Sequence, residues 1–214
     1  MTQELHSGKY PVVMLQLLRR ILRNPQELHT EGIFRKNCDM EELERLEKQV
    51  QAKKTDAIDN EQDILVACGF LKKILNNLKH PLFNYGIYNK IIAFPGGDES
   101  PLIKGILKDM EYVNHKVFML LAVFLKDYII SQEEFNKMSA YNLAVVFGPC
   151  FFRPQEYDLK DLIYSGKFAK ILIHCFDQQD ELFDPAERAL AGGVLTELKA
   201  GNLNPWSSSG FHYS

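Results

Sequence analysis

The sequence lacks the features of a membrane-spanning, zinc-binding or nucleic-acid-binding protein. Its four cysteines lie in different predicted elements and none forms a Cys-x-x-Cys pair, so their spacing disfavours a zinc site. The most apolar run, Val117 to Leu125, is too short to cross a bilayer. The net charge of −3 gives no electrostatic argument for binding nucleic acid or an acidic membrane. We therefore expect reduced thiols, no transmembrane segment and no nucleic-acid partner.

The sequence also lacks the motifs of a self-sufficient enzyme. It has no GxxxxGK[ST] loop, no GxGxxG after a strand, no GxSxG elbow and no HExxH pair among its six histidines. The carboxylates between Glu41 and Glu47 are numerous, but they fall on the polar side of an amphipathic helix. We therefore expect no metal ligands, no bound cofactor and no complete catalytic site within this chain.

The start of the chain carries no recognisable targeting segment. Met1 to Lys9 is polar and lacks the apolar stretch of a signal peptide. We therefore expect a cytoplasmic protein, with recruitment to membranes through other domains or partners.

The composition is that of an ordinary globular domain, and its apolar residues recur at helical spacing. The 214 residues are 46% apolar and 25% charged, and no alternating strand pattern of any length is present. We predict an all-α, single-domain bundle of roughly eight or nine helices. The predicted segments are Tyr10 to Arg23, Asp39 to Val50, a helix stopped by Pro81, Asn84 to Phe94, a short helix after Ser100, His115 to Ile130, Ala140 to Phe147 and Gly166 to Gln178.

Local signals mark several helix ends. Asp39 with Glu42, and Ser131 with Glu134, have the spacing of capping boxes. The pair Gly148-Pro149 is expected to end the helix before it. The helix after Asp39 is expected to bury one stripe, formed by Met40, Leu43, Leu46 and Val50.

The helical pattern also divides the chain. Residues 1–9 are predicted to be a lead-in, residues 10–184 the helical domain, and residues 185–214 a C-terminal extension that is partly flexible. A helix between Ala189 and Leu198 is weakened by two adjacent glycines, and the segment from Asn202 onward is rich in Ser, Gly and Asn.

One loop combines residues that rarely occur together on a surface. Glu31-Gly32-Ile33-Phe34-Arg35 places two bulky apolar residues between a glycine and an arginine. Ile33 and Phe34 are expected to bury and anchor the loop, and Gly32 permits a tight bend. Arg35 would then project from an anchored loop with its five N–H donors available to a phosphate. The plain alternative is a solvated or locally paired loop arginine.

Three separated segments resemble the signature blocks of the RhoGAP domain, the GTPase-activating domain for Rho-family small GTPases. The first is Thr30 to Arg35 (TEGIFR), similar to the arginine-finger loop of that family. The second is Ala67 to Leu82 (ACGFLKKILNNLKHPL), similar to its long central helix. The third is Asn136 to Pro149 (NKMSAYNLAVVFGP). The resemblance covers roughly Tyr10 to Phe183, and the all-helical fold of the family agrees with the periodicity.

The resemblance implies roles for particular residues. Arg35 matches the arginine finger, which enters the active site of a GTP-bound partner. Lys72 matches a basic residue of the partner-binding face, and Asn142 matches an asparagine that helps to hold the GTPase switch region. Lys36 and Lys73 border these positions and are expected to line the same face, although at most one of two neighbouring helix lysines can point squarely at a partner. Taken alone, a lysine at either helix position is more often a solvated side chain, and Asn142 is more often a buried asparagine that satisfies a backbone group.

The chain departs from the family pattern at three places, which makes it a divergent member. One is the end of the central helix, where the family's Leu-Pro-Glu-Pro is reduced to Leu78-Lys79-His80-Pro81. The family usually has a small Ser-Gly pair after the finger, where this chain has Lys36-Asn37-Cys38. The family's arginine four residues beyond the lysine is Asn76 here. Loss of that cation is expected to weaken docking of the GTPase or to change partner choice, and leaves Asn76 as a candidate contact.

Two classes of function follow from the resemblance. The first is a GTPase activator that binds a GTP-loaded Rho-family GTPase and completes its hydrolytic site with Arg35, while GTP and Mg²⁺ are held by the partner. The second is a non-catalytic GTPase- or protein-binding module on the same fold. The retained arginine favours activation, whereas Asn76 and the altered loop after Arg35 keep the second class open. A third interpretation is an unrelated helical scaffold.

Overall fold

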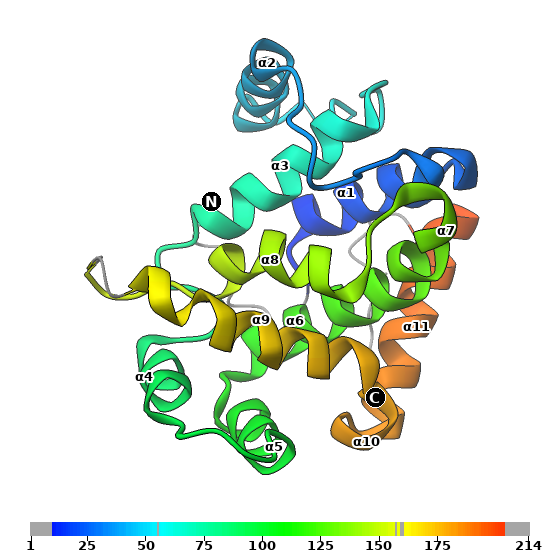
Figure 1. Ribbon diagram of the computed structural model, residues 1–214. Helices are drawn as coiled ribbons and strands as arrows, with labels where there is room; N and C mark the ends of the chain where they lie inside the picture. The colour runs from blue at the N-terminus through cyan, green and yellow to red at the C-terminus, as the bar shows by residue number, and fades with distance from the viewer. Residues whose placement is uncertain (1–9, 55, 157, 159–160, 204–214) are drawn as a thin grey trace.

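The chain folds into a bundle of helices (Figure 1). The computed structural model describes residues 10–54, 56–156, 158 and 161–203. Among these residues the only β pairing is a single bridge between Phe83 and Phe152, so the all-α prediction is confirmed. The elements are α1 (Val12–Leu22), the 3₁₀ turn η2 (Pro25–His29), α2 (Met40–Gln51), α3 (Ile64–Asn76), α4 (Tyr85–Ala93), α5 (Ser100–Asp109), α6 (Tyr112–Phe124), the π-helical turn η3 (Leu125–Ile129), the 3₁₀ turn η4 (Ile130–Gln132), α7 (Glu133–Asn136), α8 (Ala140–Phe151), α9 (Asp161–Asp177), α10 (Gln179–Leu182) and α11 (Pro185–Ala200).

The sequence pattern predicted roughly eight or nine helices. The structure describes eleven α-helices, and because α7 and α10 have only four residues each, nine are longer than a single turn. None of the helices in the described ranges is long and apolar enough to cross a membrane.

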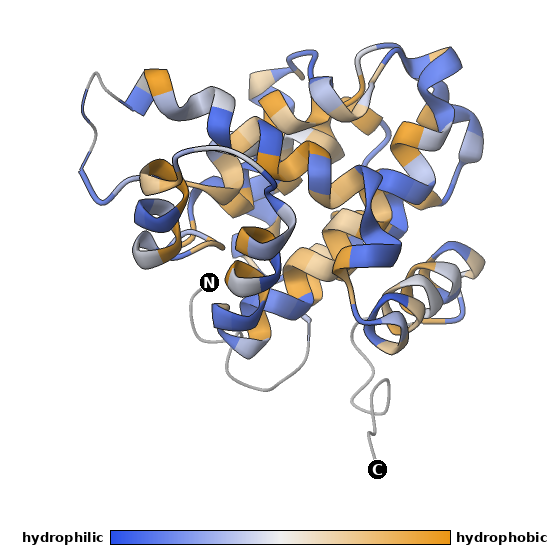
Figure 2. Ribbon diagram, turned by 60° about the horizontal axis from the view of Figure 1, so that its bottom comes forward, coloured by the Kyte–Doolittle hydropathy of each residue, from blue (hydrophilic) through white to orange (hydrophobic). Residues whose placement is uncertain are grey.

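Helix α6 lies at the centre of the bundle. Every residue from Val117 to Leu125 is at most 4% exposed, and α9 and α11 pack against this segment. Figure 2 shows hydrophobic residues concentrated on the inner helices and hydrophilic residues on the outer turns. Burial of nearly every side chain in its last two turns explains why its sequence is hydrophobic on all sides.

Polar side chains begin five of the helices. Asp39, Asp63, Asn84, Ser139 and Asp184 each accept a hydrogen bond from a backbone N–H in the first turn that follows. Such caps satisfy amides that have no partner within the helix and contribute about 1 kcal/mol each. The predicted cap at Asp39 is confirmed.

The end of α3 differs from the prediction. The helix ends at Asn76, well before Pro81. The guanidinium of Arg153 donates to the carbonyl oxygens of Asn76 and Leu78, which lie at this helix end. These free carbonyls therefore find their donor on a residue distant in sequence, and the proline is not needed to end the helix.

The end of α8 also differs from the prediction. The helix continues through Pro149 and ends at Phe151. Phe151 is fully buried, and its carbonyl oxygen accepts a hydrogen bond from the N–H of Phe83 at 3.2 Å. The N–H of Phe152 still donates to the carbonyl oxygen of Gly148 at 2.9 Å. Burial of the last turn thus outweighs the loss of one helical hydrogen bond at the proline.

Two further local predictions are wrong. Ser131 does not form a capping box, because its hydroxyl donates to the carbonyl oxygen of Asp127 within the preceding turn. Met40 is not part of a buried stripe, since 58% of it is exposed. Helix α2 packs through the side that carries Leu43 and Leu46, which are buried, and Met40 lies outside that contact.

The chain beyond residue 184 is part of the packed bundle, contrary to the boundary predicted there. Helix α11 packs against α1 and α6, and Gly201 ends it in a left-handed conformation with φ of 73°. Its buried residues are Ala191, Val194, Leu195 and Leu198. The predicted lead-in (residues 1–9) and most of the predicted flexible tail (residues 204–214) lie outside the described residues.

Gly193, one of the two adjacent glycines in α11, allows the helical assignment of this segment to be tested by substitution. Gly193 is exposed, and a Cβ atom built there meets nothing within 4 Å. Gly193→Ala is therefore expected to stabilise the protein by about 0.5–1 kcal/mol, because alanine loses less conformational entropy than glycine in a helix. Urea denaturation followed by circular dichroism measures the change in the free energy of unfolding.

A second helical glycine serves as the control. At Gly69 in α3 a Cβ atom would lie 2.7 Å from the Sγ atom of Cys38. Gly69→Ala is expected to destabilise the protein, because the clash outweighs the same gain in helix propensity. A destabilising Gly193→Ala would contradict the helical assignment of this segment.

Candidate functional site

The loop of residues 30–36, called here the Arg35 loop, is a tight bend anchored from below. Gly32 and Phe34 both have left-handed backbones, with φ of 72° and 67°. For a bulky residue such as Phe34 that conformation costs about 1–3 kcal/mol, so the surrounding structure must enforce it. The carbonyl oxygen of Gly32 accepts hydrogen bonds from the N–H groups of Arg35 and Lys36, each at 2.8 Å. The bend is therefore a closed, strained turn.

Burial of two apolar side chains offsets this strain. Ile33 is fully buried and Phe34 is 1% exposed. The Phe34 ring lies 5.2 Å from the ring of Phe147 in α8 and 6.1 Å from that of Phe124 in α6, measured between centroids. Each buried side chain contributes about 2–3 kcal/mol, which exceeds the cost of the bend. The predicted anchoring of the loop by these two residues is confirmed.

Arg35 itself points away from the protein. It is exposed, and its guanidinium has neither a hydrogen bond nor an ion pair with any residue that the structure describes. The locally paired alternative for this arginine is therefore not what the structure contains. An always-charged, five-donor group is held out on a rigid turn, where it is available to an external anion.

Lys72 supports the Arg35 loop from α3. It is half-buried, and its Nζ atom donates a hydrogen bond to the carbonyl oxygen of Phe34. This bond satisfies a carbonyl that the left-handed turn leaves without a helical or sheet partner. The sequence predicted Lys72 at a partner-binding face close to this loop, and the structure adds that its amine holds the loop.

Asn136, at the end of α7, clamps the other side of the loop. Its side chain is fully buried and donates to the carbonyl oxygens of Leu28 and Ile129, while its Oδ1 atom accepts from the N–H of Met138. Its own carbonyl oxygen accepts from the N–H of Gly32 at 2.8 Å. Sequence reasoning did not single out this residue, although it begins the third signature segment.

The two other predicted lysines are paired within the protein. The Nζ atom of Lys73 lies 2.6 Å from a carboxylate oxygen of Glu47 and so joins α3 to α2. Lys36 lies 3.5 Å from Glu31 in a pair that is half-exposed on both sides. The Lys36–Glu31 pair is open to solvent and weak, so Lys36 remains accessible to a partner, whereas Lys73 is committed to α2.

The two predicted asparagines lie in α3 and α8, which pack against each other. Asn76 is exposed at the last turn of α3. Asn142 is half-buried near the start of α8, and its Nδ2 atom donates to the carbonyl oxygen of Lys137 at 2.9 Å. Lys137 has a left-handed backbone, with φ of 58°, so Asn142 fixes the turn that leads into its own helix.

The positive charge of Lys72 acts to lower the pKa of three thiols, those of Cys38, Cys68 and Cys150. Burial raises the pKa of Cys150 to about 11, and the Lys72 charge opposes that rise. Burial also raises the pKa of Cys38, against a backbone hydrogen bond and the Lys72 charge. The Cys38 and Cys150 thiols therefore stay protonated near neutral pH and are poor nucleophiles. In the part of the chain that the structure describes, no three His, Cys, Asp or Glu side chains gather as metal ligands.

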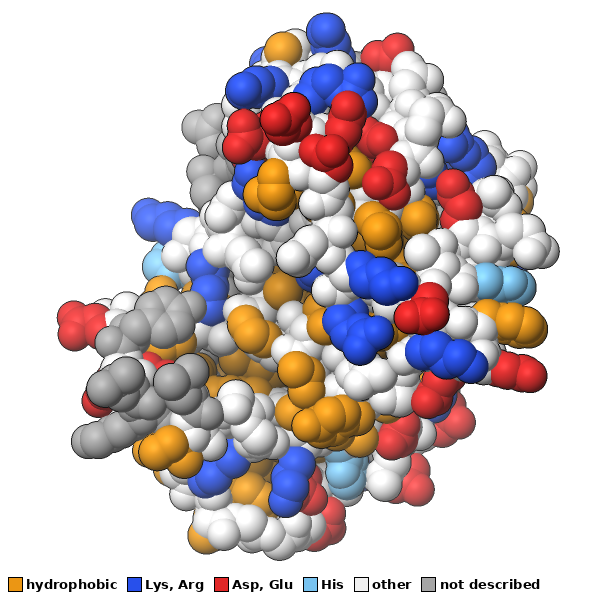
Figure 3. Space-filling view, turned by 45° about the horizontal axis from the view of Figure 1, so that its top comes forward, with side chains coloured by type: hydrophobic (Ala, Val, Ile, Leu, Met, Phe, Trp, Pro, Cys, Tyr) orange, Lys and Arg blue, Asp and Glu red, His pale blue; other side chains and the backbone are white. Residues whose placement is uncertain are grey.

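An apolar groove runs between α8 and α9, which lie side by side (Figure 1). Tyr141 and Val145 on its α8 edge are 62% and 51% exposed, and Pro149 continues the same stripe one turn later. Tyr88 and Phe168 also line the groove, whose volume is about 590 Å³. Figure 3 shows hydrophobic side chains gathered on the lower part of the face that it presents, with basic side chains beside them, and a group of acidic and basic side chains near its top. Exposed apolar patches of this kind mark protein-binding surfaces.

Comparison with known proteins places this geometry in a family. The model of the RhoGAP domain matches residues 11–156. The chain is 27% identical over 188 residues to Rho-type GTPase-activating protein 1 of Saccharomyces cerevisiae, covering 73% of this chain and 18% of that protein. It is 30% identical over 161 residues to human Rho GTPase-activating protein 1, covering 73% of this chain and 36% of that protein. It therefore spans well under half the length of these curated relatives.

A solved structure shows the same fold. Human Rho GTPase activating protein 15 superposes with a TM-score of 0.69 at 22% sequence identity, over 78% of this chain and 83% of that one. The family model covers more than half of the chain and includes the Arg35 loop, α3 and the whole of α8. The chain belongs to the RhoGAP domain family.

Proposed function

We propose that this chain is a GTPase-activating domain that binds GTP-loaded Rho-family small GTPases and inserts Arg35 into their active sites. The observation that carries the proposal is the Arg35 guanidinium, exposed and unpaired in the described structure on a turn whose two neighbouring side chains are buried. A rigid turn presents the cation in one place and so lowers the entropic cost of delivering it. The names of the curated relatives support the same class of partner.

The chemistry requires a cation that a GTPase lacks. As water attacks the γ-phosphate, negative charge spreads over the phosphoryl oxygens and the leaving β–γ bridge. The GTPase holds GTP and Mg²⁺ and positions the water, whereas this chain supplies the guanidinium and excludes solvent. The domain is thus not an enzyme by itself, because the substrate and the attacking water belong to its partner.

The apolar stripe of α8 gives the partner a surface on which to dock. Tyr141 and Val145 are exposed on the helix whose Phe147 packs against Phe34, so the stripe and the Arg35 loop share one support. We propose that this stripe and the groove beside it bind an apolar part of the GTPase surface. Docking there would place Arg35 at the edge of the interface, next to the nucleotide.

Phosphate release distinguishes activation from mere binding. Purified Rho-family GTPases loaded with GTP are assayed alone and with increasing concentrations of this chain. An activator is expected to raise single-turnover hydrolysis by about 10³-fold or more on at least one member of the panel. Binding without acceleration on every member would favour the non-catalytic module, and neither binding nor acceleration would contradict both.

Two neighbouring lysines of α3 test how the Arg35 loop is supported. Lys72→Met removes the donor to the Phe34 carbonyl oxygen, so the loop loosens and turnover at saturating GTPase is expected to fall about tenfold. Lys73→Met breaks a partly exposed pair with Glu47 and is expected to change turnover less than about twofold. Equal losses for the two variants would contradict a specific role of Lys72 in holding the loop.

A further inference from the structure

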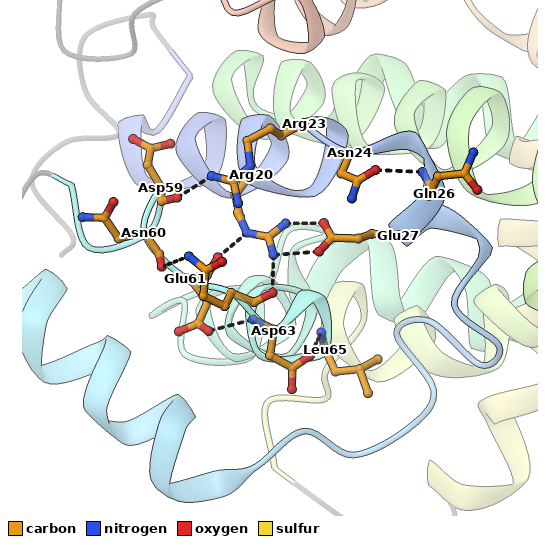
Figure 4. Close-up of polar contacts among 11 residues, drawn as sticks. Arg20, Arg23, Asn24, Gln26, Glu27, Asp59, Asn60, Glu61, Asp63 and Leu65 are labelled. Atoms are coloured by element: carbon orange, nitrogen blue, oxygen red, sulfur yellow. Dashed lines mark hydrogen bonds and ion pairs between the residues drawn. The ribbon is translucent and has the colours of Figure 1, made fainter.

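A buried arginine lies below the Arg35 loop. Arg20, in α1, is 1% exposed, and its side chain is the largest that the described core encloses completely. Figure 4 shows its guanidinium between the turn that carries Glu27 and the segment that carries Glu61. A buried cation is costly unless hydrogen bonds and an opposite charge surround it, so its presence in a core needs an explanation.

All three nitrogens of the Arg20 guanidinium donate hydrogen bonds. Its Nε atom donates to the carbonyl oxygen of Glu61 at 2.5 Å, and one terminal nitrogen donates to the carbonyl oxygen of Gln62 at 2.7 Å. The two terminal nitrogens also donate to the two carboxylate oxygens of Glu27 at 2.6 and 3.2 Å. This is the planar, two-bond geometry at which arginine excels and which lysine cannot reproduce.

Each contact holds a segment that leads directly to the site. Glu27 lies in the 3₁₀ turn η2, and its carbonyl oxygen accepts the N–H of Thr30, the first residue of the Arg35 loop. Gln62 directly precedes Asp63, the cap of α3, and α3 carries Lys72, whose Nζ atom bonds the Phe34 carbonyl oxygen. Arg20 therefore joins the turn that precedes the Arg35 loop to α3, the helix whose Lys72 supports the loop at Phe34.

We propose that the Arg20–Glu27 ion pair positions Arg35, by fixing the entry of its loop relative to α3. The inference rests on the proposed function and extends it to a pair to which no role has been given. A buried ion pair is weak support for stability alone, since apolar side chains of similar volume often stabilise a core as well or better. The ion pair fixes the position of η2 relative to the segment before α3, because four hydrogen bonds from one rigid guanidinium hold both segments.

A matched pair of variants separates positioning from stability. Glu27→Gln keeps the size of the side chain and removes the charge that pairs with Arg20. The control is Asp59→Asn, which removes the charge that pairs with Arg19, the preceding residue of α1. The two carboxylates are similarly accessible, at 25% and 31%, but Asp59 precedes α3 and the contacts found for it include none to η2.

Two readouts are measured for both variants well below their midpoints of thermal unfolding. The first is amide hydrogen exchange of residues 30–36 in the free chain, which is expected to be about tenfold faster in Glu27→Gln and nearly unchanged in Asp59→Asn. The second is turnover at saturating GTPase, which is expected to fall about tenfold or more in Glu27→Gln, because a misplaced catalytic group costs rate and not binding. Glu27→Asp, which keeps the charge, is expected to restore part of both.

The outcomes discriminate between the two proposals. Equal exchange and equal turnover in Glu27→Gln and Asp59→Asn would overturn the positioning role, even if the parent activates a GTPase. If the parent activates nothing, the proposed function fails, and the exchange measurement still tests whether the ion pair orders the loop. If Glu27→Gln is too unstable to assay, Glu27→Asp and Arg20→Lys are measured in its place, and unchanged exchange and turnover in both overturn the proposal.

Discussion

Arg35→Ala is expected to lower the stimulated rate of GTP hydrolysis by about 10³-fold or more, at saturating concentrations of the domain. A guanidinium supplied in trans accelerates hydrolysis by about 10³–10⁵-fold in small GTPases, which corresponds to about 4–7 kcal/mol of transition-state stabilisation. Binding to the GTP-loaded partner is expected to change little, because the proposed docking surface is the apolar stripe of α8, which Arg35→Ala leaves intact. Single-turnover phosphate release and a separate binding titration give the two quantities.

The variant should keep the fold, which makes the result interpretable. Arg35 is exposed and makes no side-chain hydrogen bond or ion pair with the described residues, so its truncation is expected to change stability by less than about 0.5 kcal/mol. Lys36→Ala is the matched control, since it removes the next cation of the same loop. Arg35→Lys keeps the charge without the planar fork and is expected to lose most of the activity. Full activity in Arg35→Ala would show that another group supplies the cation.

A transition-state mimic tests the same residue through binding. GDP with fluoroaluminate imitates the transition state of phosphoryl transfer. A protein group that interacts only with the transition state strengthens binding to this complex more than binding to the ground state. The parent chain is expected to bind the mimic far more tightly than the GDP form, whereas Arg35→Ala should gain little. Equal gains for the two proteins would contradict the arginine-finger mechanism.

The sequence predicted the parts of the fold that depend on neighbours along the chain. Periodic apolar residues identified most of the helices, and the cap at Asp39 is where its side-chain chemistry placed it. The burial of Ile33 and Phe34 was predictable for the same reason. Apolar side chains favour burial, glycine permits a bend and arginine favours solvent, and an anchored bend lets neighbouring residues meet all three preferences. The left-handed backbone of the Arg35 loop at Phe34 and its clamp by Asn136 were not predicted, because both depend on contacts with segments distant in the sequence.

Contacts between distant segments escaped prediction. Helix α8 passes through Pro149 because Phe83, far away in the sequence, bonds its last turn. The pairing of Arg20 with Glu27 and with the segment before α3 is invisible in a helical pattern, where an arginine normally faces solvent. Helix α11 likewise depends on burial against α1 and α6, which outweighs its two glycines. Local preference sets these elements only weakly, and tertiary packing decides them.

Asn136→Ala is expected to be the most destabilising of the substitutions considered, by about 3 kcal/mol or more. The side chain makes three hydrogen bonds in a fully buried site, so its removal leaves the carbonyl oxygens of Leu28 and Ile129 and the N–H of Met138 without their partner. Each unsatisfied buried group costs about 1–3 kcal/mol, and the cavity adds to that cost. Urea denaturation measures the loss, with an unchanged m-value as the sign that the denatured state is unaffected.

The matched control is Asn142→Ala, in the same signature segment. Its side-chain amide bonds only the nearby Lys137 carbonyl oxygen and is half-buried, so a loss of about 1 kcal/mol is expected. Because Asn136 joins the start of the Arg35 loop to the segment after α6, its loss should also speed amide exchange at Gly32 and Ile33, which Asn142→Ala should not do. A loss below about 1 kcal/mol for Asn136→Ala, or equal exchange in both variants, would mean that burial of Ile33 and Phe34 alone fixes the turn that presents Arg35.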